Sequence, residues 1–163
     1  MANAKETSII EFLRNCPTIS DNPLFFNFIN AKDDNKQFVT VANDKATNRS
    51  FVDGSVEKQY SFTIIDFRSI AYLALPLTMA ELETSENVEE YLDFQGVIDW
   101  VTEQADNKNF PDFGTDCIID SMEATTENPN LNGVDTTTTP ALAKYSVTVR
   151  ITYIDTSKAV WKN

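Results

Sequence analysis

The sequence predicts an α+β domain in which an antiparallel or mixed sheet of about five strands carries two helices packed on one face. Two segments, 56–67 and 144–154, alternate apolar and polar residues with the period of a strand that has one covered face. A third segment, 86–106, repeats apolar residues with the period of an α-helix. Because helices do not alternate regularly with strands along the chain, a doubly wound parallel sheet is disfavoured.

Length and composition support a single domain over residues 1–163. The chain is 42% hydrophobic and contains eleven Phe, which is enough for one core. Its net charge of -12 and the lack of a Lys and Arg cluster argue against binding of nucleic acid, although a negative surface would suit the passage of DNA. No apolar run reaches membrane-spanning length. We therefore expect a cytoplasmic chain that binds neither nucleic acid nor membranes.

The first predicted element is a short helix that begins at Ser8. Ser8 and Glu11 fit a capping box, in which the hydroxyl and the carboxylate accept hydrogen bonds from backbone N–H groups. Apolar residues then recur at helical spacing up to Cys16, and we expect Pro17 to end the helix. A helix this short must be held by packing on another element.

Two short runs of aromatic and β-branched residues follow, at 24–29 and 37–42. The turn-forming residues 31–36 separate them, which predicts a β-hairpin. Residues 43–48 have the composition of a polar connection.

A turn at Asp53 and Gly54 precedes the strand at 56–67. After that strand, residues 71–82 are apolar around a central Pro76. This pattern fits an extended or short helical connection to the next helix.

The helix at 86–106 carries two apolar stripes. The wider stripe, about 80° across, is the expected core face. The second consists of Leu92, Gly96 and Trp100, at i, i+4 and i+8. A helix that packs once needs only one stripe, so the second requires a partner within the chain, for which 71–82 is a candidate, or another subunit. Glycine inside a helix costs about 0.5–1 kcal/mol relative to alanine, which the close approach of a neighbour could offset.

The last third of the chain predicts two more strands, at 117–124 and 144–154. Between them lies a polar loop, 125–143, which contains four consecutive threonines: Thr136, Thr137, Thr138 and Thr139. A loop of this length without secondary structure is usually functional, or disordered until it is bound. We expect the tail, 155–163, to be mobile apart from Val160 and Trp161.

No pattern in the sequence indicates catalysis, a cofactor or a metal site. The chain has no histidine, so the commonest general base is missing, and its four glycines form no phosphate-binding loop. Cys16 and Cys117 form no metal or redox motif and are expected to be buried free thiols. With 25 acidic residues, neighbouring carboxylates are expected on the surface by chance. We therefore predict that the chain is not an enzyme.

Three features suggest surfaces for contacts with other proteins. They are the second stripe of the helix, the threonine-rich loop, and the polar face of the strand at 56–67, formed by Glu57, Gln59, Ser61 and Thr63. Each also has a simpler explanation: coverage within the chain, disorder, and ordinary exposure to solvent.

Five segments together resemble one known family. In chain order they read IIEFLRNCP at 9–17, FVDGSVEKQYSF at 51–62, EEYLDF and DWVTEQ within 89–104, NFPDF at 109–113, and AKYSVTVRITY at 143–153. This order is similar to that of the minor capsid, or tail terminator, proteins that join tail to head in long-tailed phages. The resemblance covers nearly the whole chain, although the connections at 67–85 and 128–140 are longer than the family pattern.

The resemblance implies an α+β fold like that of the lambda tail terminator and a homo-oligomeric ring of six subunits. Such a ring caps the tail tube protein and presents a surface to the head-completion proteins at the neck of the virion. It would assemble in the host cytoplasm, and DNA would pass through it without specific binding.

Two alternatives remain open. One is another structural protein of the neck or tail tube. The other belongs to a different class: a small ligand-binding or carboxylate-using enzyme domain, which would require a deep pocket with inward-pointing acidic residues.

Overall fold

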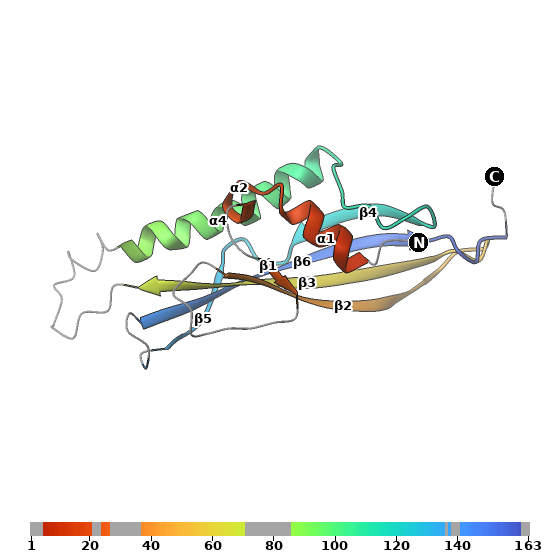
Figure 1. Cartoon of the computed structure of the whole chain (residues 1–163). Helices are drawn as coiled ribbons and strands as arrows, with labels where there is room; N and C mark the ends of the chain where they lie inside the picture. Colours follow the sequence, from red (N-terminus) through yellow and green to blue (C-terminus); the bar gives the residue numbers. More distant parts are fainter. Residues whose placement is uncertain are drawn as a thin grey trace.

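A mixed sheet with helices on one side forms the core of the protein (Figure 1). The structure, a computed structural model, describes residues 5–20, 24–26, 37–70, 86–135, 137 and 141–160. The described helices are α1 (Lys5–Leu13), α2 (Pro17–Ser20) and α4 (Glu86–Asp106). The described strands are β1 (Leu24–Phe26), β2 (Gln37–Ser50), β3 (Val56–Ile70), β4 (Cys117–Ala124), β5 (Asn130–Asp135) and β6 (Ala141–Asp155). This arrangement confirms the predicted α+β class.

The strand order is β1-β2-β3-β6-β4, with β5 also paired to β6. β3 and β6 are antiparallel along their whole lengths, from the pair Val56 and Asp155 to the pair Ile70 and Ala141. β4 and β5 follow one another along the second edge of β6, because β4 pairs with residues 149–155 and β5 with residues 142–146. β6 is therefore the strand that joins the two halves of the sheet.

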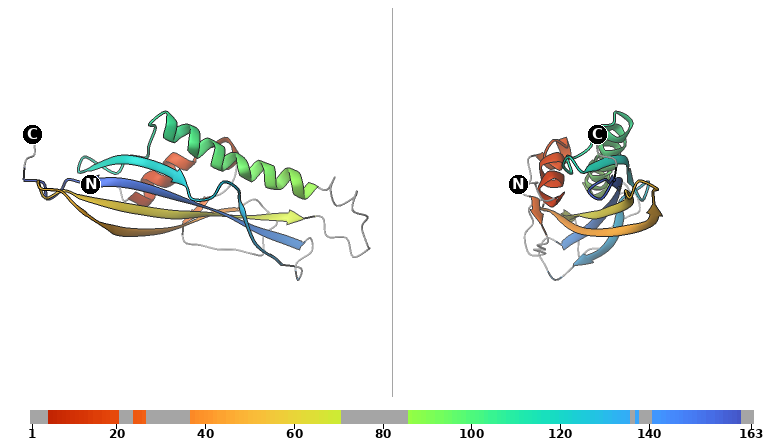
Figure 2. Two further views of the ribbon diagram at one scale, coloured as in Figure 1. Left: turned by 180° about the vertical axis from the view of Figure 1, so that it is seen from behind. Right: turned by 90° about the vertical axis from the view of Figure 1, so that its right-hand side faces the viewer.

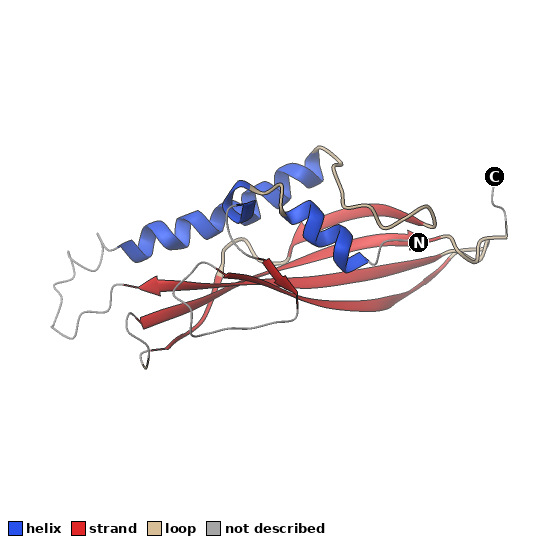
Figure 3. Cartoon of the chain, in the orientation of Figure 1, coloured by secondary structure: helices blue, strands red, loops and turns tan. Residues whose placement is uncertain are grey.

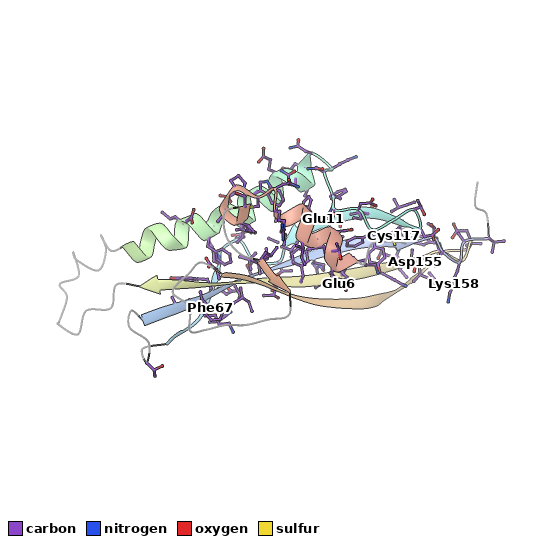
Figure 4. All side chains as sticks on the ribbon, viewed as in Figure 1. Glu6, Glu11, Phe67, Cys117, Asp155 and Lys158 are labelled. Atoms are coloured by element: carbon purple, nitrogen blue, oxygen red, sulfur yellow. The ribbon has the colours of Figure 1, made fainter. Side chains whose placement is uncertain are left out.

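The two faces of the sheet differ in what covers them. α1, α2 and α4 all lie on one face, which is clearest when the molecule is viewed along the sheet (Figures 2 and 3). The strand residues that point to these helices are at most 1% exposed: Tyr60, Phe62, Ile64, Val147, Val149, Ile151 and Tyr153. We call the opposite face, which carries the alternate residues of β3 and β6, the open face. At one end of it, Ile65 and Phe67 form a small second cluster (Figure 4).

The helices cover the sheet with the residues that their periodicity predicts. α4 buries Phe94, Val97, Ile98 and Val101, and its bounds agree with the predicted helix at 86–106. Fully burying an apolar side chain of this kind contributes about 1.5–3 kcal/mol. The short α1 is held in the same way, by Ile9, Phe12 and Leu13.

The predicted β-hairpin at 24–29 and 37–42 is wrong. β1 and the start of β2 are parallel, with Leu24 opposite Phe38 and Phe26 opposite Thr40. Strand propensity and turn-forming residues indicate that two strands are near in sequence, but they do not fix the direction of pairing. The predicted connection at 43–48 is also wrong, because these residues belong to β2 and pair with β3.

Three other boundaries differ from the sequence-based expectations. The capping box is wrong, because α1 begins at Lys5 and Ser8 lies inside the helix, 4% exposed. Pro17 does not follow α1 directly but opens α2, at a first helical position where its missing N–H is not needed. The loop predicted at 125–143 contains strand β5.

Two more expectations concern segments next to the described strands. The backbone N–H groups of Thr156 and Val160 donate to the carbonyls of Asp116 and Asp53. Thr156 is therefore tied to the domain, against the expected mobility of the tail, while the bond from Val160 agrees with the exception made for that residue. The connection at 71–82 lies outside the described residues.

Gly54 closes the turn between β2 and β3, where the backbone of the tail lies close to it. A substitution at Gly54 tests this contact. Gly54 has φ +88°, and a Cβ there would lie 2.8 Å from the carbonyl oxygen of Lys158. Gly114 has a similar φ of +92° but nothing within 4 Å of its virtual Cβ. We expect Gly54→Ala to lower the free energy of unfolding by about 2–3 kcal/mol and Gly114→Ala by about 1 kcal/mol, measured by urea denaturation. Equal losses would contradict the contact.

The ion pair between Lys58 and Asp155 gives a pH-dependent stability. Lys58 Nζ lies 2.7 Å from Asp155 Oδ2, and both side chains are partly exposed. The hydrogen bond from Lys58 and a second from the Ser157 hydroxyl hold the pKa of Asp155 well below its ordinary value, while the hydrogen bond to Asp155 raises the pKa of Lys58.

The stabilisation from the lowered pKa of Asp155 is present above about pH 4, the unfolded-state value, and is lost as the pH falls towards the folded-state value. We expect Asp155→Asn to cost about 1 kcal/mol at pH 7, after allowance for solvent screening. The difference between variant and wild type should shrink steadily below pH 4. Urea denaturation at pH 7, 4 and 2 measures it, and a constant difference would refute the assignment.

Candidate assembly surfaces

The second stripe of α4 divides between a contact inside the chain and an exposed end. A Cβ at Gly96 would lie 3.2 Å from Thr18 Oγ1, and the Thr18 hydroxyl donates a 3.4 Å hydrogen bond to the carbonyl of Asp93. Gly96 therefore admits α2 to the surface of α4. Within the described residues, this neighbour explains the glycine.

Trp100 also has a partner within the chain. Its ring is tilted against that of Phe12 on α1, with centroids 4.8 Å apart, and it packs against the main core. Leu92 behaves differently, because 58% of its surface is exposed. Of the predicted stripe, only Leu92 is left as an apolar residue facing solvent.

The polar face of β3 lies on the open face of the sheet, as the alternation predicts. Glu57, Gln59, Ser61 and Thr63 are all partly exposed. The hydroxyls of Thr63 and Thr148 share a hydrogen bond of 2.9 Å across the strands, which ties the polar surface to the ladder. This face is ordered by its own cross-strand contacts.

Two arginines on the open face were not singled out from the sequence. Arg49 pairs with Glu57 at 3.5 Å, and its side chain is 69% exposed. Arg150 donates through Nε to Glu123, 3.0 Å away, and its side chain is 40% exposed. The period-2 pattern already assigned Arg150 to the polar side, but only the register of β2 against β3 brings Arg49 to the same face.

Four predicted positions lie in the threonine-rich segment between β5 and β6. Thr137 is exposed. Thr136, Thr138 and Thr139 lie outside the described residues, so the structure neither joins them to the other candidates nor separates them.

Two polar contacts hold α1 to the sheet. Lys5 Nζ donates to the Tyr153 hydroxyl at 2.6 Å and lies over the Tyr153 ring, 4.5 Å from its centroid. The Tyr60 hydroxyl donates to Glu6 at 3.1 Å. Since both tyrosines are at most 1% exposed, these bonds give their buried hydroxyls partners, as burial requires.

The described residues contain no group of three or more possible protein ligands placed to hold a metal ion. Burial raises the pKa of both thiols, Cys16 and Cys117, which makes them poor nucleophiles at neutral pH. None of the described helices is both long enough and apolar enough to cross a membrane.

No protein-family model matches the chain, and no curated protein matches it.

Trp100 and Leu92 allow packing within the protomer to be separated from contacts between protomers. We expect Trp100→Ala to lower the free energy of unfolding by about 2–3 kcal/mol, because it removes the ring that packs on Phe12. Leu92→Ala should change it by less than about 0.5 kcal/mol. Chemical denaturation at a concentration where the chain is monomeric measures both. A large loss for Leu92→Ala would show that this residue is part of the protomer core.

Proposed function

We propose that this protein is the ring-forming subunit of a phage tail terminator, which caps the tail tube and joins tail to head at the neck. The observation that carries the proposal is the ordered set of five motifs, from IIEFLRNCP at 9–17 to AKYSVTVRITY at 143–153. Four of them lie largely in elements of the α+β core, namely α1, β3, α4 and β6, and the NFPDF motif at 109–113 lies in the loop between α4 and β4.

The chemistry of the chain supports a structural role. There is no histidine, and both cysteines have raised thiol pKa values. On the described surface, a shallow hollow along the end of α4 is lined by Asp99, Thr102, Glu103, Asp106 and Asn107. A carboxylate-using enzyme would need a deep pocket in which burial perturbs such groups.

The shape and charge of the subunit also suit a ring. One face of the sheet is covered by helices, while the other carries partly exposed polar residues over much of β3 and β6 (Figure 2), so the protomer offers two unlike surfaces to its neighbours. A net charge of -12 would repel the backbone of DNA that passes through the ring.

The experiment combines native mass spectrometry, electron microscopy and gene inactivation. The purified chain, alone or with tail tubes, is expected to form a closed ring of six subunits that binds the tube end. Inactivation of the gene in the phage that carries it should give overlong tails. A chain that stays monomeric with and without tubes would overturn the proposal, and a complete loss of tails would assign the chain to the tube instead.

A further inference from the structure

We propose that, in the ring on which the proposed function rests, the outward side of α4 in one copy docks on the open face of the sheet in the next copy. The surface on α4, here the acidic stripe, consists of Leu92, Asp99, Glu103 and Asp106. The surface on the sheet, here the arginine face, consists of Arg49, Arg150, Ile118 and Ile154. The occupant of each surface is thus a second copy of this chain.

The acidic stripe points away from the core of its own protomer. At 100° per residue its four members fall within about 60°, on the side of α4 opposite Phe94 and Val101. All four are exposed, and α4 contains no Lys or Arg that could compensate its carboxylates. Glu103 and Asp106 lie in the last turn, where the helix dipole favours cations and opposes acids. A neighbouring cation would relieve both the repulsion among these carboxylates and their unfavourable interaction with the helix dipole.

The arginine face supplies such cations on the opposite side of the molecule. Arg49 and Arg150 each hold one carboxylate of their own chain, but a guanidinium has five N–H donors and both side chains are well exposed. Beside them, Ile118 is 57% exposed and lies opposite the partly exposed Ile154 in the register of β4 and β6. The face therefore combines an apolar patch with two accessible cations.

The spacing along α4 matches the spacing along β6. On α4, Leu92 lies about 10 Å from Asp99 and about 16 Å from Glu103 along the axis, at 1.5 Å per residue. On the sheet, Ile154 lies about 14 Å from Arg150 along β6 and about 10 Å from Arg49 across two strands. With α4 aligned along β6, Leu92 can rest on the isoleucines while Asp99 and Glu103 lie on either side of Arg150.

This pairing is head-to-tail, because the two surfaces are different and lie on opposite sides of one protomer (Figure 2). A head-to-tail interface closes into a ring when its rotation divides a full turn. Two like surfaces would repel each other instead, since acidic stripe would meet acidic stripe.

Charge reversal on each surface tests the pairing. The helix variant carries Asp99→Lys and Glu103→Lys, and the sheet variant carries Arg49→Glu and Arg150→Glu. Each variant alone places like charges across every interface, so the concentration at which the ring dissociates should rise about tenfold or more. The chain with all four substitutions should assemble again. An equimolar mixture of the two variants should form rings in which the variants alternate, because each interface then joins opposite charges.

The matched control is Glu11→Lys with Asp112→Lys, which changes the charge by the same amount as the helix variant. These two residues line one shallow hollow between α1 and the loop after α4, away from both surfaces, and should leave the ring intact. Circular dichroism and thermal unfolding of each variant confirm that the protomer is folded.

Analytical ultracentrifugation and native mass spectrometry give the readout. Loss of the ring in both variants with rescue in the mixture supports the pairing. Two results would overturn this assignment of faces: rings that form equally well in the wild type and in both variants, or loss of the ring without rescue in the mixture. Neither result would contradict the proposed function. A wild-type chain that never assembles, even with tail tubes, defeats the proposed function as well.

Discussion

The pairing of β3 with β6 is the constraint on which the rest of the structure depends. Both strands have a strict period of two, so one register buries Tyr60, Phe62 and Ile64 together with the apolar set of β6. A slip of one residue would exchange the buried and polar sets, which fixes the register strongly. Because this pair places most of its large apolar side chains on one side, the helices pack there. The opposite side carries mostly polar, partly exposed residues, with Ile65, Phe67 and Ser146 buried at one end.

The helices then follow from the size of that apolar surface. α4 covers part of this apolar surface with one stripe of buried residues, and α1 and α2 cover the remaining area beside α4. The close approach at Gly96 and the contact of Trp100 with Phe12 are consequences of this three-helix layer. Apolar residues on a second side of α4 therefore serve the fold first, and only Leu92 remains for a partner.

Strongly periodic segments could be predicted from the sequence, and the rest could not. The bounds of α4 and β4, the core face of β3 and the α+β class follow from repeats that burial imposes on the chain. Pairing between strands sets the direction of β1 against β2 and continues β2 through 43–48. Such long-range pairing cannot be recognised from the polar residues of these segments alone. The same holds for the site: alternation identified the open face, but only register brings Arg49 and Arg150 onto it together.

The sheet leaves a surface on which another copy could pack, but the strongly acidic chain repels other copies. A net charge of -12 repels other copies at long range, so any stable contact between copies must place the few accessible cations against carboxylates. In the described part of the chain, Arg49 and Arg150 lie on the open face, while Asp99, Glu103 and Asp106 lie on the outward side of α4, a helix without Lys or Arg, on the other side of the protomer. Such a distribution disfavours symmetric pairing of like faces and favours a repeating head-to-tail contact. The division of polar and apolar residues that folds the protomer thereby also directs how copies can meet.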